Sequence, residues 1–157
     1  MKIRLLKFKN VKSTNDIALK LIKKKKLTTL IISSEGQTQG RGTMGKKWIS
    51  KKGNLFFSIF FEINPKKINF KHYAILNAYL LKGIISKEIS KKIRIKWPND
   101  LLFNKKKICG ILQEVITYNE KKFLIVGVGI NTNFNPQNKD FLSSSLKEIT
   151  NKNVDNS

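Results

Sequence analysis

Apolar residues recur at helical spacing in two segments of this chain. In the first segment Ile17, Ala18 and Leu21 share one side, and they follow residues 13–16, whose side-chain oxygens can cap a helix N-terminus. The second segment, residues 72–89, has the length and the periodicity of an amphipathic helix. Its predicted apolar side consists of Tyr73, Leu76, Leu80 and Ile84. The pattern therefore predicts one short and one long helix.

Runs rich in β-branched and aromatic residues predict strands between and after these helices. The predicted strands cover residues 27–33, 54–63, 93–97, 101–103, 107–118 and 123–130. The last three are joined by short polar turns, so we expect an antiparallel meander. Residues 35–45 are rich in glycine and predict a loop, and residues 141–149 predict a short final helix. The order of these elements predicts an α+β fold with a mixed, mainly antiparallel β-sheet flanked by helices.

Length and composition limit the classes of protein to which the chain can belong. Its 157 residues suffice for one domain with a buried core, so we expect residues 1–157 to form a single domain. The single cysteine, Cys109, excludes an internal disulfide framework and a multi-cysteine zinc site, and it fits a reducing cytoplasm. No stretch reaches the roughly 18 apolar residues that a membrane-spanning helix needs, so no membrane association is expected.

Charge is the unusual feature of the composition. Lys and Arg number 32 against 10 Asp and Glu, which gives a net charge of +22. Such a field attracts phosphates, so a basic nucleic-acid-binding domain is one interpretation. The other interpretation is compositional drift, because lysines are spread along the whole chain and far outnumber arginines. Groove and phosphate readers depend heavily on arginine, so the excess of lysine favours drift.

Residues 36–48 contain the first candidate site. Closely spaced glycines, among them Gly40 and Gly42, let backbone N–H groups approach an anion, and Arg41 and Lys46 add positive charge. Trp48 ends the segment with a flat ring on which a base or an apolar chain can rest. The same composition also fits a solvated basic loop without a ligand.

The segment Lys-Trp-Pro-Asn-Asp, residues 96–100, is the second candidate site. Lys96 and Asp100 lie at the end of a predicted strand, where Pro98 changes the direction of the chain. Asp100 could hold Mg²⁺ beside the phosphates of ATP, since Mg²⁺ takes one or two carboxylates together with phosphate oxygens. Alternatively, Asn99 and Asp100 cap the backbone of a turn.

Glycines inside predicted strands mark two further positions where a ligand can come close. Lys107 stands three residues before Gly110, and Cys109 beside that glycine fits a small core residue better than a nucleophile. In the run Gly-Val-Gly-Ile-Asn, residues 127–131, two glycines leave room for a ligand and the asparagine can bond to a polar edge. A β-bulge is the alternative interpretation of this run.

The order of these segments matches that of one known family. The matching positions are Ser13, Thr14, Asn15, Gln37, Gly40, Arg41, Gly42, Trp48, Asn54, Leu55, residues 96–100, Lys107, residues 110–112, Glu114 and residues 127–131. Over residues 13–133 the chain resembles the biotin–protein ligases, and Lys-Trp-Pro-Asn-Asp is the most specific part of the resemblance. The resemblance implies a fold similar to the class II synthetase catalytic domain. It also implies an enzyme that activates biotin with ATP to biotinyl-5'-AMP and transfers biotin to a lysine.

The resemblance further implies roles for individual residues and partners. The implied biotin-binding positions are Ser13, Thr14, Asn15, Gln37, Gly40, Arg41, Lys107, Gly110, Leu112, Gly127 and Gly129. The implied nucleotide-binding positions are Arg41, Gly42, Lys46, Trp48 and Asn131. The implied catalytic positions are Lys107, Arg41, Lys96 and Asp100, with Asp100 also the candidate Mg²⁺ ligand. The expected partner is the biotin carboxyl carrier protein of acetyl-CoA carboxylase, and a homodimer is compatible with the resemblance.

The chain departs from the family pattern in two ways. Thr43 stands two residues after Arg41, where family members often have another arginine, and this predicts a leakier adenylate. The sequence has no counterpart of the DNA-binding winged helix or of the small C-terminal barrel, so we expect a catalytic domain without a repressor role. The alternatives are a degenerate ligase with weak turnover, the basic nucleic-acid binder, and a lipoate–protein ligase, against which Gln37 and Lys-Trp-Pro-Asn-Asp argue.

Overall fold

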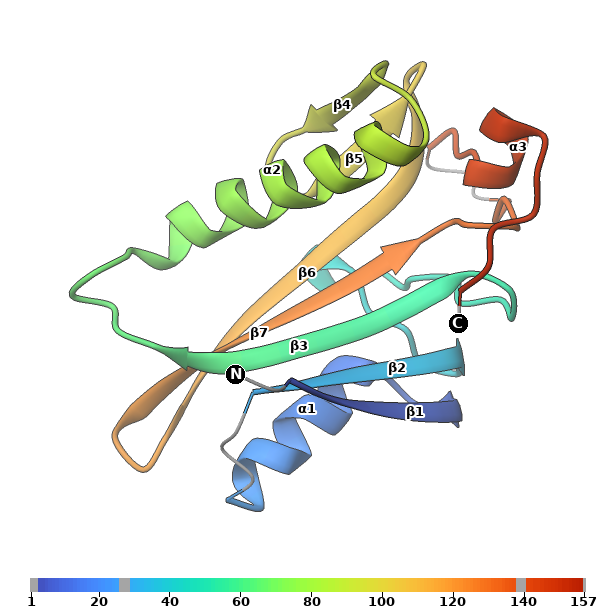
Figure 1. Cartoon of the computed structure of the whole chain (residues 1–157). Coiled ribbons are helices and arrows are strands. Elements are labelled where there is room, and N and C mark those ends of the chain that lie inside the picture. The colour runs from blue at the N-terminus through green and yellow to red at the C-terminus, as the bar shows by residue number, and fades with distance from the viewer. Residues whose placement is uncertain (1–2, 26–28, 138–140, 157) are drawn as a thin grey trace.

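A seven-stranded β-sheet forms the centre of the computed structural model, which describes residues 3–25, 29–137 and 141–156 (Figure 1). The strands are β1 (Arg4–Val11), β2 (Leu30–Gln37), β3 (Leu55–Ile63), β4 (Ile93–Lys96), β5 (Asp100–Phe103), β6 (Lys106–Tyr118) and β7 (Lys121–Ile130). The helices are α1 (Thr14–Lys23), α2 (Phe70–Glu88) and α3 (Leu146–Thr150), and Thr43–Gly45 forms a short 3-10 turn, η1. The order in the sheet is β1-β2-β3-β7-β6-β5-β4. The first pair, β1 and β2, is parallel and the other five pairs are antiparallel, which confirms the predicted fold class.

The sheet has two different faces because side chains point alternately to opposite sides along each strand. α1 lies against one of them, here called the α1 face, where Ala18 and Ile22 pack with Phe60 of β3. α2 lies on the other side of the sheet, here called the α2 face (Figure 1). On that face its buried residues Ala78 and Ile85 join an apolar cluster that includes residues of β5, β6 and β7. The two helices thus bury separate halves of the core.

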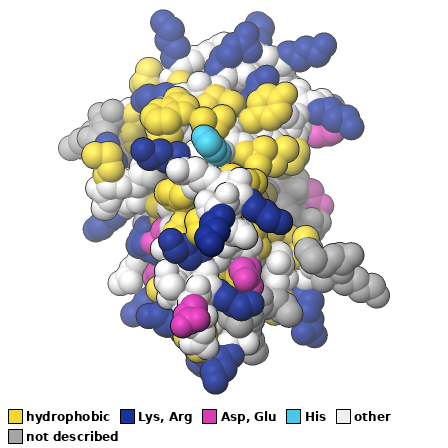
Figure 2. Space-filling model, turned by 90° about the vertical axis from the view of Figure 1, so that its left-hand side faces the viewer, with side chains coloured by type: hydrophobic (Ala, Val, Ile, Leu, Met, Phe, Trp, Pro, Cys, Tyr) yellow, Lys and Arg dark blue, Asp and Glu magenta, His cyan; other side chains and the backbone are white. Residues whose placement is uncertain are grey.

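The long helix α2 is confirmed, but most of its predicted buried side was wrong. Leu76, Leu80 and Ile84 are 44%, 50% and 64% exposed, whereas Ala78 and Ile85 are buried against the sheet. Because α2 has apolar residues around most of its circumference, periodicity alone could not decide which side packs. Hydrophobic side chains are visible on the surface in Figure 2, with Lys and Arg around them.

The first strand, β1, was not predicted. It lies at the edge of the sheet and mixes Lys7 and Lys9 with apolar residues, as edge strands commonly do. It therefore lacks the continuous β-branched run by which a central strand is recognised. This strand was predicted over residues 27–33, of which residues 27 and 28 lie outside the described part of the chain, and β2 continues to Gln37. The loop predicted over residues 35–45 therefore begins only after Gln37.

The starts of the first and the last predicted helix differ in detail from the prediction. Ser13 occupies the N-cap position of α1, but its side chain makes no capping hydrogen bond. The final helix covers only Leu146–Thr150, where Ser145 and Glu148 form a capping box that fixes its start. No helix in the described ranges combines the length and the hydropathy that a bilayer-spanning helix requires.

Candidate functional site

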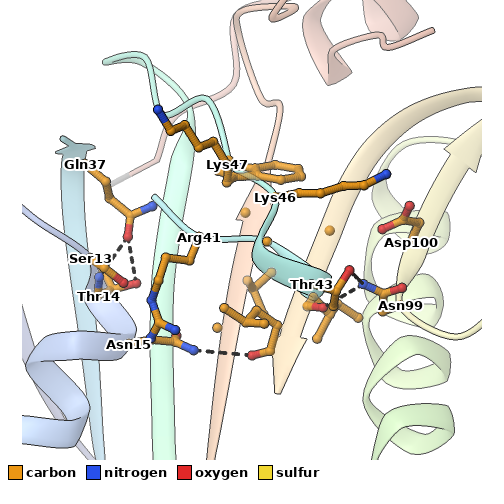
Figure 3. A pocket seen from close by; sticks show the side chains of 18 of the residues that line it. Ser13, Thr14, Asn15, Gln37, Arg41, Thr43, Lys46, Lys47, Asn99 and Asp100 are labelled. Carbon is orange, nitrogen blue, oxygen red and sulfur yellow. Dashed lines mark hydrogen bonds between the residues drawn. The ribbon is translucent and has the colours of Figure 1, made fainter. Parts of the chain in front are cut away.

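A cavity of about 70 Å³ lies on the α1 face, beneath the segment that follows β2 (Figure 3). The predicted site residues that line it are Ser13, Thr14, Asn15, Gln37, Arg41, Gly42, Lys46, Trp48, Asp100, Lys107, Gly110, Leu112, Gly127 and Gly129. These residues come from α1, β2, η1's flanks, β5, β6 and β7. The fold therefore gathers segments that are far apart in the sequence around one space, which has room for only a few water molecules.

Three strand glycines form the floor of the cavity. Gly110 and Gly129 are direct neighbours across β6 and β7, and Gly127 pairs with Ser58 of β3. A Cβ atom at Gly110 would lie 2.6 Å from the ring of Trp48, and one at Gly129 would overlap the same ring. The glycines are therefore required for the close approach of the indole to the sheet, and the alternative of a β-bulge at residues 127–131 was wrong, since β7 pairs regularly there.

One end of the cavity, the neutral end, is lined by Ser13, Thr14, Asn15 and Gln37, with Ser58 buried behind them. The backbone N–H of Thr14 donates to Oε1 of Gln37 at 2.8 Å, and Nε2 of Gln37 donates to Oγ of Ser50 at 2.9 Å. Oγ of Ser58 lies 2.7 Å from Oγ1 of Thr14 and 2.5 Å from Oδ1 of Asn15. The helix start and two strands thus hold Thr14, Asn15, Gln37 and Ser58 in one hydrogen-bonded group. Figure 3 shows Thr14, Asn15 and Gln37 of this group, with Ser13 beside them.

Arg41 lies beside the neutral end and is engaged by two carboxylates. Its guanidinium donates to both oxygens of Glu114 at 2.8 Å and to Asp16 at 2.9 Å. The hydrogen bond that Arg41 donates to Glu114 is the main reason that the pKa of Arg41 is raised. Glu114 also accepts from Nδ2 of Asn15 at 2.7 Å. The predicted anion-binding arginine is therefore tied to protein carboxylates in this state of the chain.

The opposite end of the cavity, the cationic end, consists of Lys46, Lys47, Trp48, Asp100 and Lys107. Nζ of Lys107 is 2.7 Å from Oδ1 of Asp100, and both side chains are only 16% exposed. The same Nζ lies 5.2 Å from the centre of the Trp48 ring, a cation–π distance. Lys46 and Lys47 are exposed; in Figure 3 Lys46 extends toward Asp100, whereas the amine of Lys47 points away from it. Positive charge is thus concentrated at this end.

Two buried polar atoms at the cationic end and beside it find no hydrogen-bond partner among the residues that the structure describes. Nε1 of Trp48 and Oδ1 of Asn131 are both in this group, although Nδ2 of Asn131 donates to backbone oxygens of Lys107 and Ser144. Oδ1 of Asp100 is paired with Nζ of Lys107 in an ion pair of 2.7 Å. Buried polar groups usually have partners, so the atoms of Trp48 and Asn131 mark places where a ligand can pair.

Asn131 does not line the main cavity but a smaller neighbouring one. That hollow is bounded by Trp48, Asn131 and Phe141, together with Lys47, Ile49 and Pro136. Trp48 separates the two spaces. The predicted nucleotide-binding pair Trp48 and Asn131 is therefore brought together.

The glycine-rich segment after β2 folds back on itself. The N–H of Gly42 donates to the backbone oxygen of Lys46 at 2.7 Å, and the N–H of Trp48 donates to that of Gly40 at 2.9 Å. Gly40 is enclosed by Trp48 and Ser50 and does not line the cavity. The predicted cradle of free backbone N–H groups is absent from these two positions, so the segment must rearrange before its amides can bind an anion.

Lys96 and Cys109 lie away from the cavity. Lys96 is an exposed residue of β4, opposite Asp100 in the strand register, and it does not line the cavity. Cys109 is fully buried on the α2 face, and burial raises the pKa of its thiol to about 12. A thiol with so high a pKa is a poor nucleophile, which agrees with the interpretation of Cys109 as a core residue.

Ser58, Asn99 and Phe141 were not predicted as site residues. Ser58 alternates with Phe56 and Phe60 on the buried side of β3, and a hydroxyl in such a row is a signal that sequence analysis could have used. Asn99 donates to the backbone oxygen of Ile111 at 3.0 Å and lines the cavity. Phe141 places its ring 5.0 Å from Nζ of Lys107, a contact that no local pattern could reveal.

The described residues provide little for a preformed metal site. No group of three or more His, Cys, Asp or Glu side chains is positioned to hold a metal ion within these ranges. Asp100 offers one carboxylate beside Lys107, and Asn99 offers an amide. One carboxylate is enough for Mg²⁺ when phosphate oxygens complete its coordination. The residues therefore fit a Mg²⁺ ion that arrives with a nucleotide.

Comparison with known proteins assigns the chain to a family. The model of the biotin/lipoate A/B protein ligase family matches residues 7–131. The chain belongs to this family. All but one of the residues that line the cavity, Phe141, fall within the matched segment.

Relatives within the family agree with this assignment. The chain is 33% identical over 123 residues to the bifunctional ligase/repressor BirA of Bacillus spizizenii, a match that covers 77% of this chain and 37% of that protein. It is 29% identical over 122 residues to the biotin–[acetyl-CoA-carboxylase] ligase of Paracoccus denitrificans, covering 76% of this chain and 50% of that protein. The chain thus spans between about two fifths and one half of the length of these relatives.

A solved structure extends the similarity to three dimensions. The biotin protein ligase from Aquifex aeolicus, determined in complex with biotin and ATP, superposes with a TM-score of 0.77 at 32% sequence identity. The superposition covers 97% of this chain and 63% of that protein. The mixed seven-stranded sheet with its helices is therefore the fold of the catalytic domains of biotin protein ligases.

Proposed function

We propose that the chain is the catalytic domain of a biotin–protein ligase. In this proposal biotin and ATP form biotinyl-5'-AMP and pyrophosphate, and biotin then passes to a lysine of the biotin carboxyl carrier protein of acetyl-CoA carboxylase. The observation that carries the proposal is a single cavity whose neutral, hydrogen-bonding end is connected to a cationic end by a floor of glycines. Biotin has the matching sequence of groups, which are a polar ring, an apolar tail and a carboxylate.

The neutral end is suited to the ring of biotin. A cyclic urea presents two N–H donors and one carbonyl acceptor, and Ser13, Thr14, Asn15 and Gln37 offer both kinds of partner. The apolar tail then lies over Gly127 and Gly129, beside Leu112. Trp48 rests on Gly110 and Gly129, so the indole must move for the tail to enter.

The cationic end is suited to the first reaction. An oxygen of the biotin carboxylate attacks the α-phosphorus of ATP, a new P–O bond forms, and pyrophosphate leaves. Both reactants are anions, so Lys107 is placed to offset their repulsion and to stabilise the charge that develops in the transition state. Arg41 can add its charge once it leaves the carboxylates of Asp16 and Glu114. Mg²⁺, held through Asp100, would supply further positive charge to the phosphates.

The nucleotide is assigned to the space around Trp48 and Asn131. The ring of Trp48 offers a stacking surface for adenine, and the unpaired Oδ1 of Asn131 can accept from its amino group. The segment containing Gly42 and Lys46 is suited to close over the phosphates once its internal hydrogen bonds open. Thr43 adds no charge to this closure, which supports the expected leakier retention of the adenylate.

The second reaction transfers the biotinyl group. The amine of the acceptor lysine attacks the acyl carbon, the bond from that carbon to the phosphate oxygen breaks, and AMP leaves. No covalent intermediate with the enzyme is needed. Lys96 lies outside the cavity, at the strand next to Asp100, where it can help only when the carrier protein has docked. A cytoplasmic location follows from the carrier proposed here.

Biotin-dependent exchange of labelled pyrophosphate into ATP tests the proposal. We expect exchange that requires biotin, is not supported by lipoate, and falls sharply in Lys107→Ala. Lys106→Ala is the matched control, because this neighbouring lysine is exposed and does not line the cavity. Exchange that is supported by lipoate instead would identify a lipoate ligase. Biotin binding without exchange would indicate a degenerate ligase, and tight salt-dependent binding of nucleic acid without biotin binding would indicate a nucleic-acid-binding domain.

A further inference from the structure

Ser58 connects two of the residues of the neutral end without lining the cavity itself. It is fully buried in β3, and its hydroxyl oxygen lies within hydrogen-bonding distance of Oγ1 of Thr14 (2.7 Å) and Oδ1 of Asn15 (2.5 Å). Thr14 and Asn15 line the cavity, whereas Ser58 does not. The direction of the hydrogen bonds through Ser58 therefore decides what Thr14 can offer to a ligand.

The orientation of the Asn15 amide is fixed by its surroundings. Its Nδ2 lies 2.7 Å from the carboxylate of Glu114 and 3.5 Å from the backbone oxygen of Leu112, both of which can only accept. The nitrogen must point toward these acceptors, so Oδ1 points toward Ser58. The other side of the amide rests on Gly127, where a Cβ atom would overlap it. Asn15 cannot turn over without losing these contacts.

The single hydrogen of the Ser58 hydroxyl must therefore point to Oδ1 of Asn15. Oδ1 of Asn15 is an acceptor, so at 2.5 Å Ser58 must donate to it. The contact with Thr14 at 2.7 Å then requires that the Thr14 hydroxyl donates and that Ser58 accepts. The competing acceptor of the Thr14 hydroxyl, Oε1 of Gln37, is 3.2 Å away and already accepts from the backbone N–H of Thr14.

We propose that Ser58 is a positioning residue that makes the Thr14 hydroxyl an obligate hydrogen-bond acceptor toward the ligand. Thr14 donates to Ser58, Ser58 donates to Asn15, and Asn15 donates to Glu114, whose other partner is Arg41. Only lone pairs of Thr14 remain for the cavity. The inference rests on the proposed function and deepens it, because it selects a ligand ring that presents an N–H group at this point.

The consequence is selectivity among rings of similar size. A cyclic urea donates an N–H to Thr14, whereas a cyclic carbamate with a ring oxygen at that position places one acceptor against another. A dithiolane ring, as in lipoate, has no donor at all. A site built around a buried acceptor binds a ligand that lacks the matching N–H donor much more weakly, because the acceptor is then left unpaired.

The test compares biotin with its two carbamate analogues, each with one ring N–H replaced by oxygen, by titration calorimetry on the unmodified chain. We expect one of the two carbamates to bind at least about 100-fold more weakly than biotin. Binding of all three compounds within threefold of each other would overturn the role of Ser58 while leaving the proposed function intact. Failure of the chain to bind biotin would overturn the proposed function and this inference with it.

Two variants extend the test. In Ser58→Ala the Thr14 hydroxyl can donate to the ligand, so the ratio of the dissociation constants of the weaker carbamate and biotin should fall below about tenfold. Biotin itself should bind about 10- to 100-fold more weakly than to the unmodified chain. Ser34→Ala is the matched control, since Ser34 is a buried serine whose hydroxyl bonds only to the backbone oxygen of Gly36 among the described contacts. It should leave the ratio of affinities unchanged.

Thr14→Val covers the case in which Ser58→Ala does not fold. It removes the hydroxyl at nearly constant volume, so it should also reduce the difference between biotin and the weaker carbamate to below about tenfold. A ratio that stays above about 100-fold in the folded variant, whether Ser58→Ala or Thr14→Val, would overturn the inference. If Ser58 had only a structural role, Ser58→Ala would weaken the binding of all three ligands equally, and the ratio of their dissociation constants would not change.

Discussion

The two ends of the cavity differ in how completely their polar atoms are paired. At the neutral end Thr14, Asn15, Gln37 and Ser58 all have hydrogen-bond partners within the protein. At the cationic end Trp48, and in the adjoining hollow Asn131, each have a buried polar atom to which the described residues offer no hydrogen-bond partner, while Asp100 is held only by its ion pair with Lys107. The neutral end is therefore organised before the ligand arrives, whereas the cationic end is completed by it. In the proposed reaction this difference separates recognition of the ring from the chemistry on the phosphate.

Removal of charge at the cationic end should give the largest effect. Lys107→Ala is expected to lower the single-turnover rate of adenylate formation about 10²- to 10³-fold, because a fixed cation that stabilises the transition state is lost. The dissociation constant of biotin should change by less than about tenfold, since the neutral end is untouched. Rapid-quench kinetics and calorimetry measure the two quantities. An equal loss in both would show that the two ends do not act separately.

A change in the floor should disturb the place where the two ends meet. Gly129→Ala adds a Cβ atom where the ring of Trp48 lies, so the indole is displaced and pyrophosphate exchange should fall about 10- to 100-fold. Tryptophan fluorescence in a Trp97→Phe background reports the displacement, because Trp97 is 70% exposed and otherwise dominates the signal.

The matched control for this change is Gly83→Ala. A Cβ at Gly83 meets nothing within 4 Å, and Gly83 lies inside α2, so the substitution should raise the free energy of unfolding by about 0.5–1 kcal/mol and leave exchange unchanged. Unchanged fluorescence and activity in Gly129→Ala would contradict the close packing of Trp48 on the floor.

Glu114 joins Asn15 of the neutral end to Arg41, the cation beside that end. Glu114→Gln replaces one carboxylate oxygen by an amide nitrogen, which then faces donors from Asn15 or Arg41. We expect the affinity for biotin and the rate of adenylate formation each to fall about tenfold. Glu62→Gln is the control, because Glu62 forms an exposed ion pair with Lys121. A loss confined to one of the two quantities would place Glu114 at one end only.

The smallest effect on the cavity is expected from the α2 face, where only the stability of the fold should respond. Burial raises the pKa of Cys109 from 9.0 to about 12, so above pH 9 the unfolded chain releases a proton that the folded chain retains. Stability should therefore fall as the pH rises from about 9 to 12, by up to about 1.4 kcal/mol per unit from this group. Urea denaturation of the unmodified chain and of Cys109→Ala at pH 8 to 10.5 measures the difference, and parallel pH profiles would contradict it.

Much of the fold could be predicted from local patterns, since most strands and both longer helices are periodic. The strand over residues 54–63 differs from β3 by one residue, because its aromatic run has clear ends. The edge strand β1 and the buried side of α2 could not be predicted in this way. An edge strand tolerates lysines, and a helix that is apolar on several sides gives no preferred direction.

The candidate site was predicted to a similar extent. Residues in continuous motifs, such as Lys107 and Asp100, line the cavity as predicted. Ser58 was missed because its strand resembles any buried strand, and Phe141 was missed because its contact with Lys107 joins segments without a shared pattern. Lys96 was predicted from its motif, yet strand alternation and the turn at residues 97–99 leave it outside the cavity.

The sequence by itself determined the kinds of groups present and their order along the chain. Glycines that permit close approach, a lysine before them and a polar helix start are properties of single residues and short spacings. Only the tertiary structure decided which groups meet, because hydrogen-bond direction, ion pairing and burial depend on neighbours from distant strands. The orientation of Asn15 between Ser58 and Glu114 is set by three segments far apart in sequence, and no local pattern contains it.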